Sequence, residues 1–434
     1  MAIKHSYVHA SADLADTSVV RPSDWNADHT VADGSLTIAK TSGLQSALDV
    51  RGISVMDYGA VGDGVVDCTS AFQSALDAAI ASGGTVIVPA GNYLVSSTLT
   101  LGDSSSSVRL IGNSKGLGAV GSRIKWTGAG PCITIPGCVH WEIANLRIDG
   151  VSTGENGVLI TSNAAGTQVA RSGILRDMVI TGLTDKCITL TSFSYVTIAR
   201  VSTTGGTLGV YIAPDNGVLK EFLRINESSV HAATVCGMHL AEGSQIHLYS
   251  VNITGSPIGL LIGGTGAGEV FHVHSDKLTV DNCTTYSIEV FADAASVMRS
   301  SFRDTYIFMK GVDVGEKAIY VHRSSTFIMG RTMFDGIDVA KAGSTAPTIA
   351  LDFSLLSDNS SLRGIRNVAG GTMVIGSPTT LVEPTVAAAA PTTGAHLIRE
   401  IVYNSAPAAD GYLGWVCVTA GTPGTWKGFG AIAS

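Results

Sequence analysis

The chain of 434 residues carries a formal net charge of -8 at pH 7, and the lack of a basic stretch excludes a nucleic-acid partner of the usual kind. Its length exceeds the roughly 250 residues at which one compact core stops growing, which favours several domains or a repeat fold. Glycine makes up 51 of the 434 residues, well above the average of about 7%, which indicates many turns. Charged residues make up only 14%, against an average of about 25%, which indicates a surface of neutral polar side chains.

Residues 1–52 show no long core-building periodicity. Residues 25–29 read Trp-Asn-Ala-Asp-His, and residues 42–49 read Ser-Gly-Leu-Gln-Ser-Ala-Leu-Asp. In the second element Leu44 and Leu48 fall on one face of a short helix, which is too brief to be stable alone and fits the neck of a trimer. A lone His29 without a second ligand at metal-binding spacing favours a structural role, and we expect no metal site.

The stretch from residue 55 to 95 predicts a cap and a first coil. A turn-rich segment is followed by Thr69 or Ser70, either of which is placed to cap a helix that ends at Gly83. Residues 85–95 then read as two short strands around a Pro-Ala-Gly turn. The apolar positions at helical spacing are Phe72, Leu76, Ala79 and Ile80.

This opening resembles that of the pectate-lyase-like right-handed β-helix superfamily, which includes bacteriophage tailspikes. The pattern is Asp-Tyr-Gly-Ala-x-Gly-Asp-Gly from residue 57, an amphipathic helix, and Gly-Gly-x-Val-x-Val-Pro-x-Gly-x-Tyr from residue 83. The resemblance implies the fold but not the activity, because lyases, hydrolases, epimerases and inert fibres share it. Residues 1–52 are similar to the N-terminal regions of phage tail fibres, which implies attachment to the phage tail.

From residue 130 onward a unit recurs that consists of a small, an apolar, a variable and an apolar residue. It returns every 22 to 31 residues, and further apolar pairs follow each unit about ten residues later. The pattern predicts a solenoid with two or three strands per coil, stacked in parallel about 4.8 Å apart. For residues 53–382 we therefore expect an all-β, single-stranded parallel β-helix, right-handed as the resemblance implies. The first apolar positions are Ile133, Val158, Ile188, Val210, Met238, Leu260, Ile288, Ile319 and Ile349.

Stacking converts equal positions in successive coils into columns on the surface, and the variable residue of each unit points outward. The predicted column is Thr134, Leu159, Thr189, Tyr211, His239, Leu261, Glu289, Tyr320 and Ala350. A second column is predicted from Arg224, His247 and His272. Rings stack on sugars and charges fix hydroxyl groups, so we expect substrate contacts from both columns; the alternative is an ordinary solvated face or a trimer contact. The residues expected to bind substrate are Tyr211, His239, His247, Tyr249, His272, Glu289 and Tyr320.

Pairs of carboxylates at matched positions are candidates for catalysis. Asp276 and Asp304 each lie 16 residues after the first apolar position of their coil. If the turns of the two coils are alike, the two carboxyl groups lie one coil apart, about 5 Å, which is the separation expected of the catalytic carboxylates in a retaining glycosidase. Glu242, Glu269 and Asp293 lie on nearby turns and offer a wider, inverting pair. The alternative is coincidence among the 35 acidic residues.

The same region fits a lyase, in which a base removes a proton next to a uronic carboxylate. His247, His272 and Tyr249 are the candidates for that base. A third alternative is a spike that binds its receptor without cleaving it.

Residues 383–434 begin with a Pro- and Ala-rich linker and continue with alternating apolar residues, which predicts a small antiparallel β module. The run Gly-Trp-Val-Cys-Val-Thr-Ala-Gly-Thr-Pro-Gly-Thr-Trp-Lys-Gly-Phe-Gly at 414–430 resembles C-terminal segments of phage tail fibres and tailspikes. About fifty residues make a marginal core, so we expect trimerisation to stabilise the module.

Seven cysteines without a Cys-x-x-Cys pair favour small buried side chains over disulfides or zinc, and no cofactor is expected. No apolar run is long enough to cross a membrane, and the N-terminus has no signal-peptide core. The resemblance and the repeat together predict a homotrimeric phage tailspike. It would be made in the host cytoplasm, carried on the virion tail, and would cleave a capsule, exopolysaccharide or O-antigen at the bacterial surface by glycoside hydrolysis.

Overall fold

The computed structural model describes residues 2–3, 29–30, 52–102, 107–116, 120–214, 219–264, 267–292, 297–323, 332–347, 349–353, 360–375, 380–381 and 385–433. The chain divides into two units, Met1–Ile53 and Ser54–Ser434. In the first, β1 (Ala2–Ile3) pairs antiparallel with β2 (His29–Thr30). The predicted neck helix at 42–49 and the carboxylate Asp293 lie outside the described residues.

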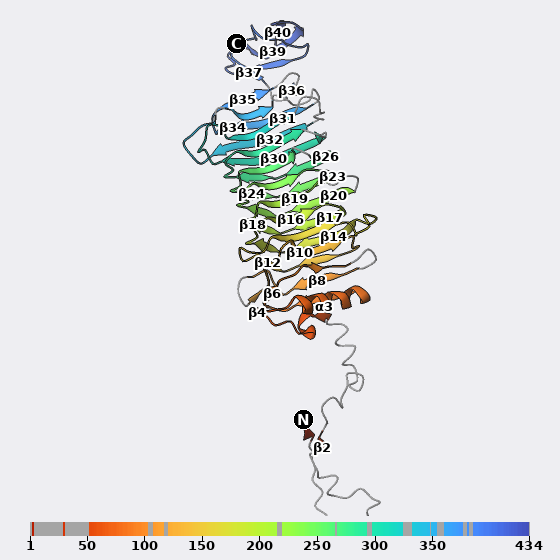
Figure 1. Ribbon diagram of the computed structural model, residues 1–434. Helices are drawn as coiled ribbons and strands as arrows, with labels where there is room; N and C mark the ends of the chain where they lie inside the picture. Colours follow the sequence, from red (N-terminus) through yellow and green to blue (C-terminus); the bar gives the residue numbers. More distant parts are fainter. Residues whose placement is uncertain are drawn as a thin grey trace, which may run out of the picture. The chain divides into compact units, whose positions relative to one another are not determined.

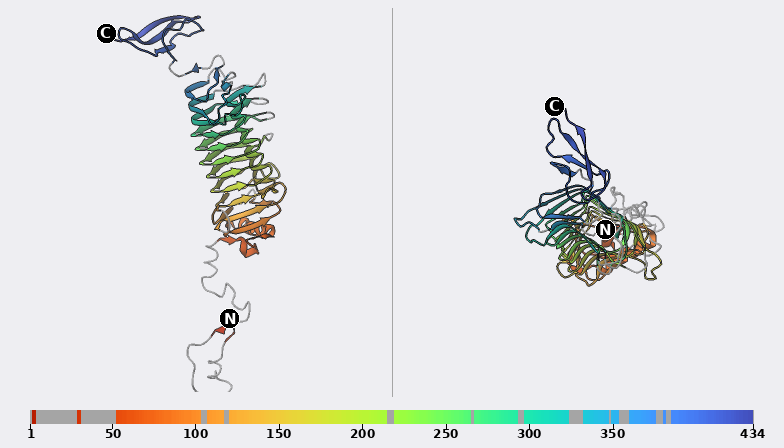
Figure 2. Two further views of the ribbon diagram at one scale, coloured as in Figure 1. Left: turned by 90° about the vertical axis from the view of Figure 1, so that its left-hand side faces the viewer. Right: turned by 90° about the horizontal axis from the view of Figure 1, so that it is seen from above.

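The second unit is a right-handed parallel β-helix whose coils each contribute up to three strands, which we call a, b and c in chain order (Figures 1 and 2). Stack a consists of β7 (Leu99–Thr100), β10 (Pro131–Pro136), β13 (Asn156–Thr161), β16 (Lys186–Leu190), β19 (Leu208–Ile212), β22 (Cys236–Leu240), β25 (Ile258–Gly263), β28 (Tyr286–Ala292), β31 (Lys317–Arg323), β33 (Ile349–Phe353) and β35 (Thr372–Ile375).

Stack b consists of β5 (Thr85–Val88), β8 (Arg109–Gly112), β11 (Glu142–Ala144), β14 (Ala170–Arg176), β17 (Phe193–Ala199), β20 (Lys220–Asn226), β23 (Gly243–Tyr249), β26 (Val270–Asp276), β29 (Val297–Met298), β30 (Ser300–Met309), β32 (Thr332–Lys341), β34 (Ser361–Asn367) and β36 (Thr380–Leu381). Stack c consists of β4 (Asp63–Asp67), β6 (Gly91–Val95), β9 (Ser122–Trp126), β12 (Arg147–Asp149), β15 (Val179–Thr181), β18 (Ser202–Thr204), β21 (Ser229–His231), β24 (Asn252–Thr254) and β27 (Thr279–Asp281). From β30 onward b and c merge into one longer strand, because β30 pairs with both β26 and β27.

The predicted helix is α3 (Thr69–Ser82), which lies at the N-terminal end of the stack after β3 (Ile53–Ser54) and η2 (Val55–Tyr58) (Figure 1). Its N-cap is Cys68, one residue before Thr69 and two before Ser70, the predicted caps. The Asp67 carboxylate accepts hydrogen bonds from the Thr69 backbone N–H and hydroxyl instead. The helix buries Phe72 and Leu76 among other residues and contacts β5 and β7, so it covers the first coil.

The predicted repeat is confirmed by the strand register, except in its last unit. Ile133, Val158 and Ile188 are register partners, and the same alignment runs on through β31. In β33 the partner of Ile319 is Leu351, two residues later than the predicted Ile349. Ala350 is consequently buried inside the coil, and Asp352 takes its predicted place in the outward column.

The small residue that opens each unit is explained by packing between strands a and c. A Cβ added at Gly237 would lie 2.8 Å from the Gly259 carbonyl oxygen and still closer to a methyl group of Ile253. Gly209 and Gly259 face Val230 and Val280 in the same way. The position therefore admits only a small side chain wherever a branched aliphatic residue of strand c fills the coil.

Residues 385–433 form a separate four-stranded sheet of β37 (Thr385–Ala387), β38 (Ile401–Asn404), β39 (Tyr412–Thr419) and β40 (Thr425–Ala431). The predicted antiparallel pairing is confirmed for β38, β39 and β40, but β37 pairs in parallel with β38. All seven cysteines are free and buried, as predicted. Among the described residues, no helix combines the length and the apolar character that crossing a membrane requires.

We predict that Gly237→Val lowers the free energy of unfolding by about 1 to 3 kcal/mol, because the added methyl groups overlap backbone and a packed side chain. Thermal or urea unfolding measures the change. The matched control is Gly315→Val, since a Cβ at that turn meets only Asp313 at 3.4 Å and should change stability by less than about 0.5 kcal/mol. Equal stability of the two variants would contradict the packing explanation.

Candidate functional site

The outward side of stack b, here called the b face, carries three columns of side chains from β17 to β30. The first column is Tyr195, Phe222, Gln245, His272 and Arg299. The second is Thr197, Arg224, His247, His274 and Ser301. The third is Ala199, Asn226, Tyr249, Asp276 and Arg303.

The first column is held in an unusual backbone conformation. Tyr195, Phe222, Gln245 and His272 have φ between 54° and 57°, the left-handed region that side chains rarely adopt. Each such residue costs about 1 to 2 kcal/mol, yet the conformation recurs in successive coils. The recurrence keeps the residues of this column in line from coil to coil and aims their side chains outward.

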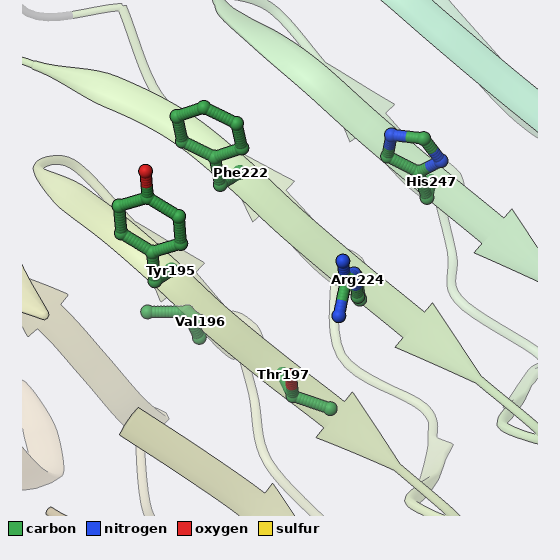
Figure 3. A pocket seen from close by; sticks show the side chains of 6 residues that line it. All are labelled: Tyr195, Val196, Thr197, Phe222, Arg224 and His247. Carbon is green, nitrogen blue, oxygen red and sulfur yellow. The ribbon is translucent and has the colours of Figure 1, made fainter. Parts of the chain in front are cut away.

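Two rings of the first column form a flat aromatic platform. Tyr195 and Phe222 lie on neighbouring strands with ring centroids 4.3 Å apart and planes 6° from parallel (Figure 3). Tyr195 is 58% exposed. Sequence reasoning missed both residues, because the left-handed residue interrupts the alternation on which a two-residue period depends.

The second column contains His274 where the sequence predicted His272. Arg224 pairs with His247, and His247 pairs with His274. His272 belongs to the first column instead. Leu240 pairs with Ile262 but Gly243 pairs with Val270, so the connection from strand a to strand b is five residues longer in the later coil. The imidazole rings of His247 and His274 lie 5.1 Å apart, and His274 Nδ1 is 2.7 Å from Ser301 Oγ.

Both imidazoles of the second column favour their neutral form. Partial burial and then the positive charge of Arg224 lower the pKa of His247 below its ordinary value. Partial burial, followed by His247, His272 and Arg303, lowers the pKa of His274. At neutral pH both rings are therefore available to accept a proton or a hydrogen bond.

A shallow hollow of about 110 Å³ lies beside the platform. It is bordered by the first two columns, and Figure 3 shows the rings of Tyr195 and Phe222 on adjacent strands, with Arg224 and His247 farther along the same face. The residues that line it are Tyr195, Val196, Thr197, Phe222, Arg224 and His247.

The third column brings acidic and basic groups together near Tyr249. Asn226 pairs with Tyr249, Tyr249 with Asp276, and Asp276 with Arg303. Lys277 Nζ lies 3.4 Å from the Tyr249 hydroxyl and 5.4 Å from its ring centroid. The Tyr249 hydrogen bond raises the pKa of Lys277, and the charges of Asp276 and Asp304 act in the same direction.

The predicted equivalence of Asp276 and Asp304 is wrong. The register partner of Asp276 is Arg303, and Asp304 follows it in a left-handed turn with φ 45°. Gly263 pairs with Phe291 but Val270 pairs with Val297, so the connection from strand a to strand b is one residue shorter in the later coil. Counting 16 residues from the first apolar position therefore reaches a register position in the later coil that is one residue beyond the partner of Asp276. Both carboxylates nevertheless raise the pKa of Lys277.

The other predicted carboxylates stand apart from this group. Glu242 binds the ammonium group of Lys220 at 3.0 Å, and the Lys220 side chain is only 1% exposed. Glu242 thus neutralises a buried charge, which is a structural role. Glu269 is exposed just before β26.

The outward side of stack a, here called the a face, holds the other predicted binding residues: Tyr211, His239, Glu289 and Tyr320. The predicted set is therefore divided between two faces, with His247, Tyr249 and His272 on the b face. Tyr211 and His239 are half-buried with rings 5.2 Å apart, and burial raises the pKa of the former and lowers that of the latter.

The charges of the a face are paired with one another. Glu289 is 7% exposed and lies 2.7 Å from His322 Nε2. The His322 ring stacks 4.1 Å from Tyr320 and Phe291. His239 Nε2 is 2.7 Å from the Gly263 carbonyl oxygen. The sequence analysis missed His322, although it follows Tyr320 by two residues and so shares its side of the strand.

One further ion pair completes the a face, between Lys317 and Asp352 at 2.8 Å. The Lys317 ammonium group also lies 3.5 Å from the Tyr320 ring centroid. Within the described residues, no three His, Cys, Asp or Glu side chains gather in a metal-binding arrangement.

Comparison with known proteins supports the fold. Residues 52–130 match the family described as rhamnogalacturonase A/epimerase, pectate lyase-like. The mannuronan C5-epimerase AlgE5 of Azotobacter vinelandii is 61% identical over 44 residues, which are 10% of this chain and 4% of the epimerase. The capsule KN3-specific depolymerase 1 of Klebsiella phage KN3-1 is 28% identical over 201 residues, 46% of this chain and 22% of the depolymerase. The matches thus span less than a quarter of either relative.

Solved structures share the β-helix at low sequence identity. The enzymatically active domain of tailspike protein 2 of bacteriophage CBA120 is similar with a TM-score of 0.54 and 15% identity, over 84% of this chain and 57% of that one. PfbA, a surface adhesin of Streptococcus pneumoniae, has a TM-score of 0.54 and 15% identity over 87% of this chain and 99% of that one. At such identity the likeness shows the fold alone.

We predict that Arg224→Gln raises the pKa of His247 toward its ordinary value of about 6.5, because it removes a neighbouring positive charge that opposes protonation. NMR titration of ¹³C-labelled histidine measures the shift. Arg366→Gln is the control, since Arg366 pairs with Asp338 in the part of β34 that continues stack c, in register with Thr279 of β27. An unchanged His247 pKa in Arg224→Gln would show that Arg224 exerts no field on the imidazole.

Proposed function

We propose that this pectate-lyase-like β-helix protein is a phage tailspike that binds and cleaves a bacterial surface polysaccharide on its b face. The observation that carries the proposal is the exposed array of rings and charges in the three columns of that face. The partial match to a capsule-specific phage depolymerase and the fold shared with a phage tailspike support it. On this proposal the protein is carried on the virion tail and acts at the bacterial surface.

The b face suits a polysaccharide better than a small molecule. Its columns run across several coils about 4.8 Å apart, so successive sugars of a chain meet successive rows. Tyr195 and Phe222 present a flat apolar surface to a sugar ring, and Asn226, Gln245 and Tyr249 supply hydrogen-bonding groups. The a face is less suited, because its carboxylates are nearly buried and already paired.

Glycoside hydrolysis is the proposed reaction, with Asp276 and Asp304 as the carboxylates. One protonated carboxyl group gives its proton to the oxygen of the scissile bond as that bond breaks. The other attacks the anomeric carbon directly or takes a proton from an attacking water. The negative charges of both groups act on Lys277, the residue that follows Asp276 in the chain.

β-Elimination is the second candidate, and the neutral His247 beside Arg224 favours it. Arg224 would neutralise a uronic carboxylate and so acidify the proton on the neighbouring carbon. His247 would accept that proton while the glycosidic oxygen leaves and a carbon–carbon double bond forms. Tyr249 is the alternative base.

Trimerisation through the C-terminal module is part of the proposal. Val402 and Cys417 are the fully buried apolar side chains that the described part of this module provides, whereas Leu397, Ile398 and Leu413 are at least 50% exposed. So small a core cannot stabilise a four-stranded sheet of this size alone, and covering the exposed side chains with those of two further copies would supply the missing burial.

We predict that Asp276→Asn and Asp304→Asn each reduce cleavage of the polysaccharide by at least about a hundred-fold while leaving the melting temperature nearly unchanged. Reducing ends report hydrolysis, and ultraviolet absorbance of unsaturated uronic products reports elimination. Asp77→Asn on α3 is the matched control, because that exposed carboxylate accepts a hydrogen bond from Gln73 of the same helix.

The outcomes of this assay separate the candidate reactions. Unsaturated products that persist in both Asn variants and vanish in His247→Ala would replace hydrolysis by elimination. Binding to cells without any cleavage by the unmodified protein would leave a receptor-binding spike and overturn the enzymatic proposal.

We predict that light scattering at micromolar concentration gives a trimer, three times the 44.6 kDa of the chain. Deletion of residues 383–434 should yield monomer or aggregate, because it removes the proposed trimer contact and exposes an unpaired β edge. A monomeric intact protein would refute the proposal, and a soluble trimer after the deletion would locate the subunit contact in the β-helix.

A further inference from the structure

We propose that the b face is built for an acidic polysaccharide, with Arg224 and Arg303 as the groups that hold its negative charges. This inference rests on the proposed function for the location of the saccharide, and it adds the chemical class of the substrate.

The first support is that the b face carries exposed cations without carboxylate partners. Arg224, Arg299 and Arg303 are exposed, and within the described residues none of them forms an ion pair. Most other arginines of the coils are paired; Arg176 and Arg200, for example, both bind Asp177. In a chain with a net charge of -8, unpaired arginines gathered on one face are the complement of an external anion.

The second support is the contrast with the a face. There Glu289 lies 2.7 Å from His322 Nε2 and Asp352 binds Lys317, so both carboxylates have a partner within the protein. On the b face Arg303 has a carboxylate as register neighbour on each side, Asp276 in the coil before and Asp335 in the coil after, yet within the described residues it forms an ion pair with neither. The guanidinium group of Arg303 therefore remains available for a carboxylate on a ligand, which it can bind through two parallel hydrogen bonds.

The spacing indicates a polymer rather than a single acidic sugar. Arg224 and Arg303 are separated by three coils, about 14 Å along the stack, with His247 and His274 between them. One monosaccharide cannot reach both arginines. A chain with an acidic group in each repeating unit can, while its neutral sugars lie on the Tyr195 and Phe222 platform.

The same charges would also attract a nucleic acid, but the remaining groups favour sugar. Asn226, Gln245, Tyr249 and Ser301 lie beside the arginines on the three columns and match hydroxyl groups. The platform offers two stacked rings in one place, whereas a single strand of nucleic acid is held by a series of rings that follow its bases.

Binding to defined polymers tests the inference without reference to cleavage. The full chain is run by affinity electrophoresis at 4 °C through gels that contain polygalacturonate, alginate, hyaluronate, dextran or pullulan. We expect retardation by at least one of the three carboxylated polymers and by neither neutral polymer. Arg224→Gln and Arg303→Gln should each weaken that binding about ten-fold, the loss of one charged hydrogen-bonded contact. Higher salt should weaken it further.

Arg366→Gln is the matched control, since it removes an exposed arginine from β34, where it pairs with Asp338. Its binding should equal that of the unmodified chain. Retardation by dextran or pullulan, no retardation by any carboxylated polymer, or binding unaffected by Arg224→Gln and Arg303→Gln would each overturn the inference. Tighter binding to a single-stranded oligonucleotide than to every carboxylated polymer would also overturn it. Because the readout is binding, a protein that cleaves nothing can still confirm the acidic ligand, and one that cleaves a neutral glycan refutes it.

Discussion

The parallel register between successive coils is the constraint on which the rest of the structure depends. Inward residues such as Ile188, Val210 and Met238 stand one above another and are almost completely buried. Each such side chain contributes about 1.5 to 3 kcal/mol through the removal of apolar surface from water. A slip of one residue would turn this whole row outward, so the register is held firmly and the outward columns follow from it.

Differences in coil length are absorbed by the connections between strands. The connection from strand a to strand b is one residue shorter in the coil that contains Phe291 and Val297 than in the coil before it. The left-handed residues of the first column recur in spite of their conformational cost. Together these features keep the three columns of the b face straight while the sequence between them varies, and a regular surface of this kind is what an extended ligand needs.

The two outward faces differ in how their charges are neutralised. On the a face the protein supplies both members of each pair, which leaves its carboxylates nearly buried and fixed. On the b face the aromatic platform is open, and Arg224, Arg299 and Arg303 have no ion-pair partner among the described residues. The first arrangement suits a surface that stays closed, and the second suits a surface that meets a ligand of opposite charge.

The sequence by itself determined the β-helix, the capping helix and the buried face of every coil from β10 to β31, because a hydrophobic repeat and small residues at fixed positions admit no other packing of these strands. It did not determine which polar residues meet. His274 rather than His272, Arg303 rather than Asp304, and Asp352 rather than Ala350 occupy the predicted places. Those assignments depend on how many residues each connection between strands contains, because a change in that number leaves the hydrophobic pattern unchanged and moves a side chain from one column to the next. Only the tertiary structure, through the pairing of each strand with the coils above and below, decided them.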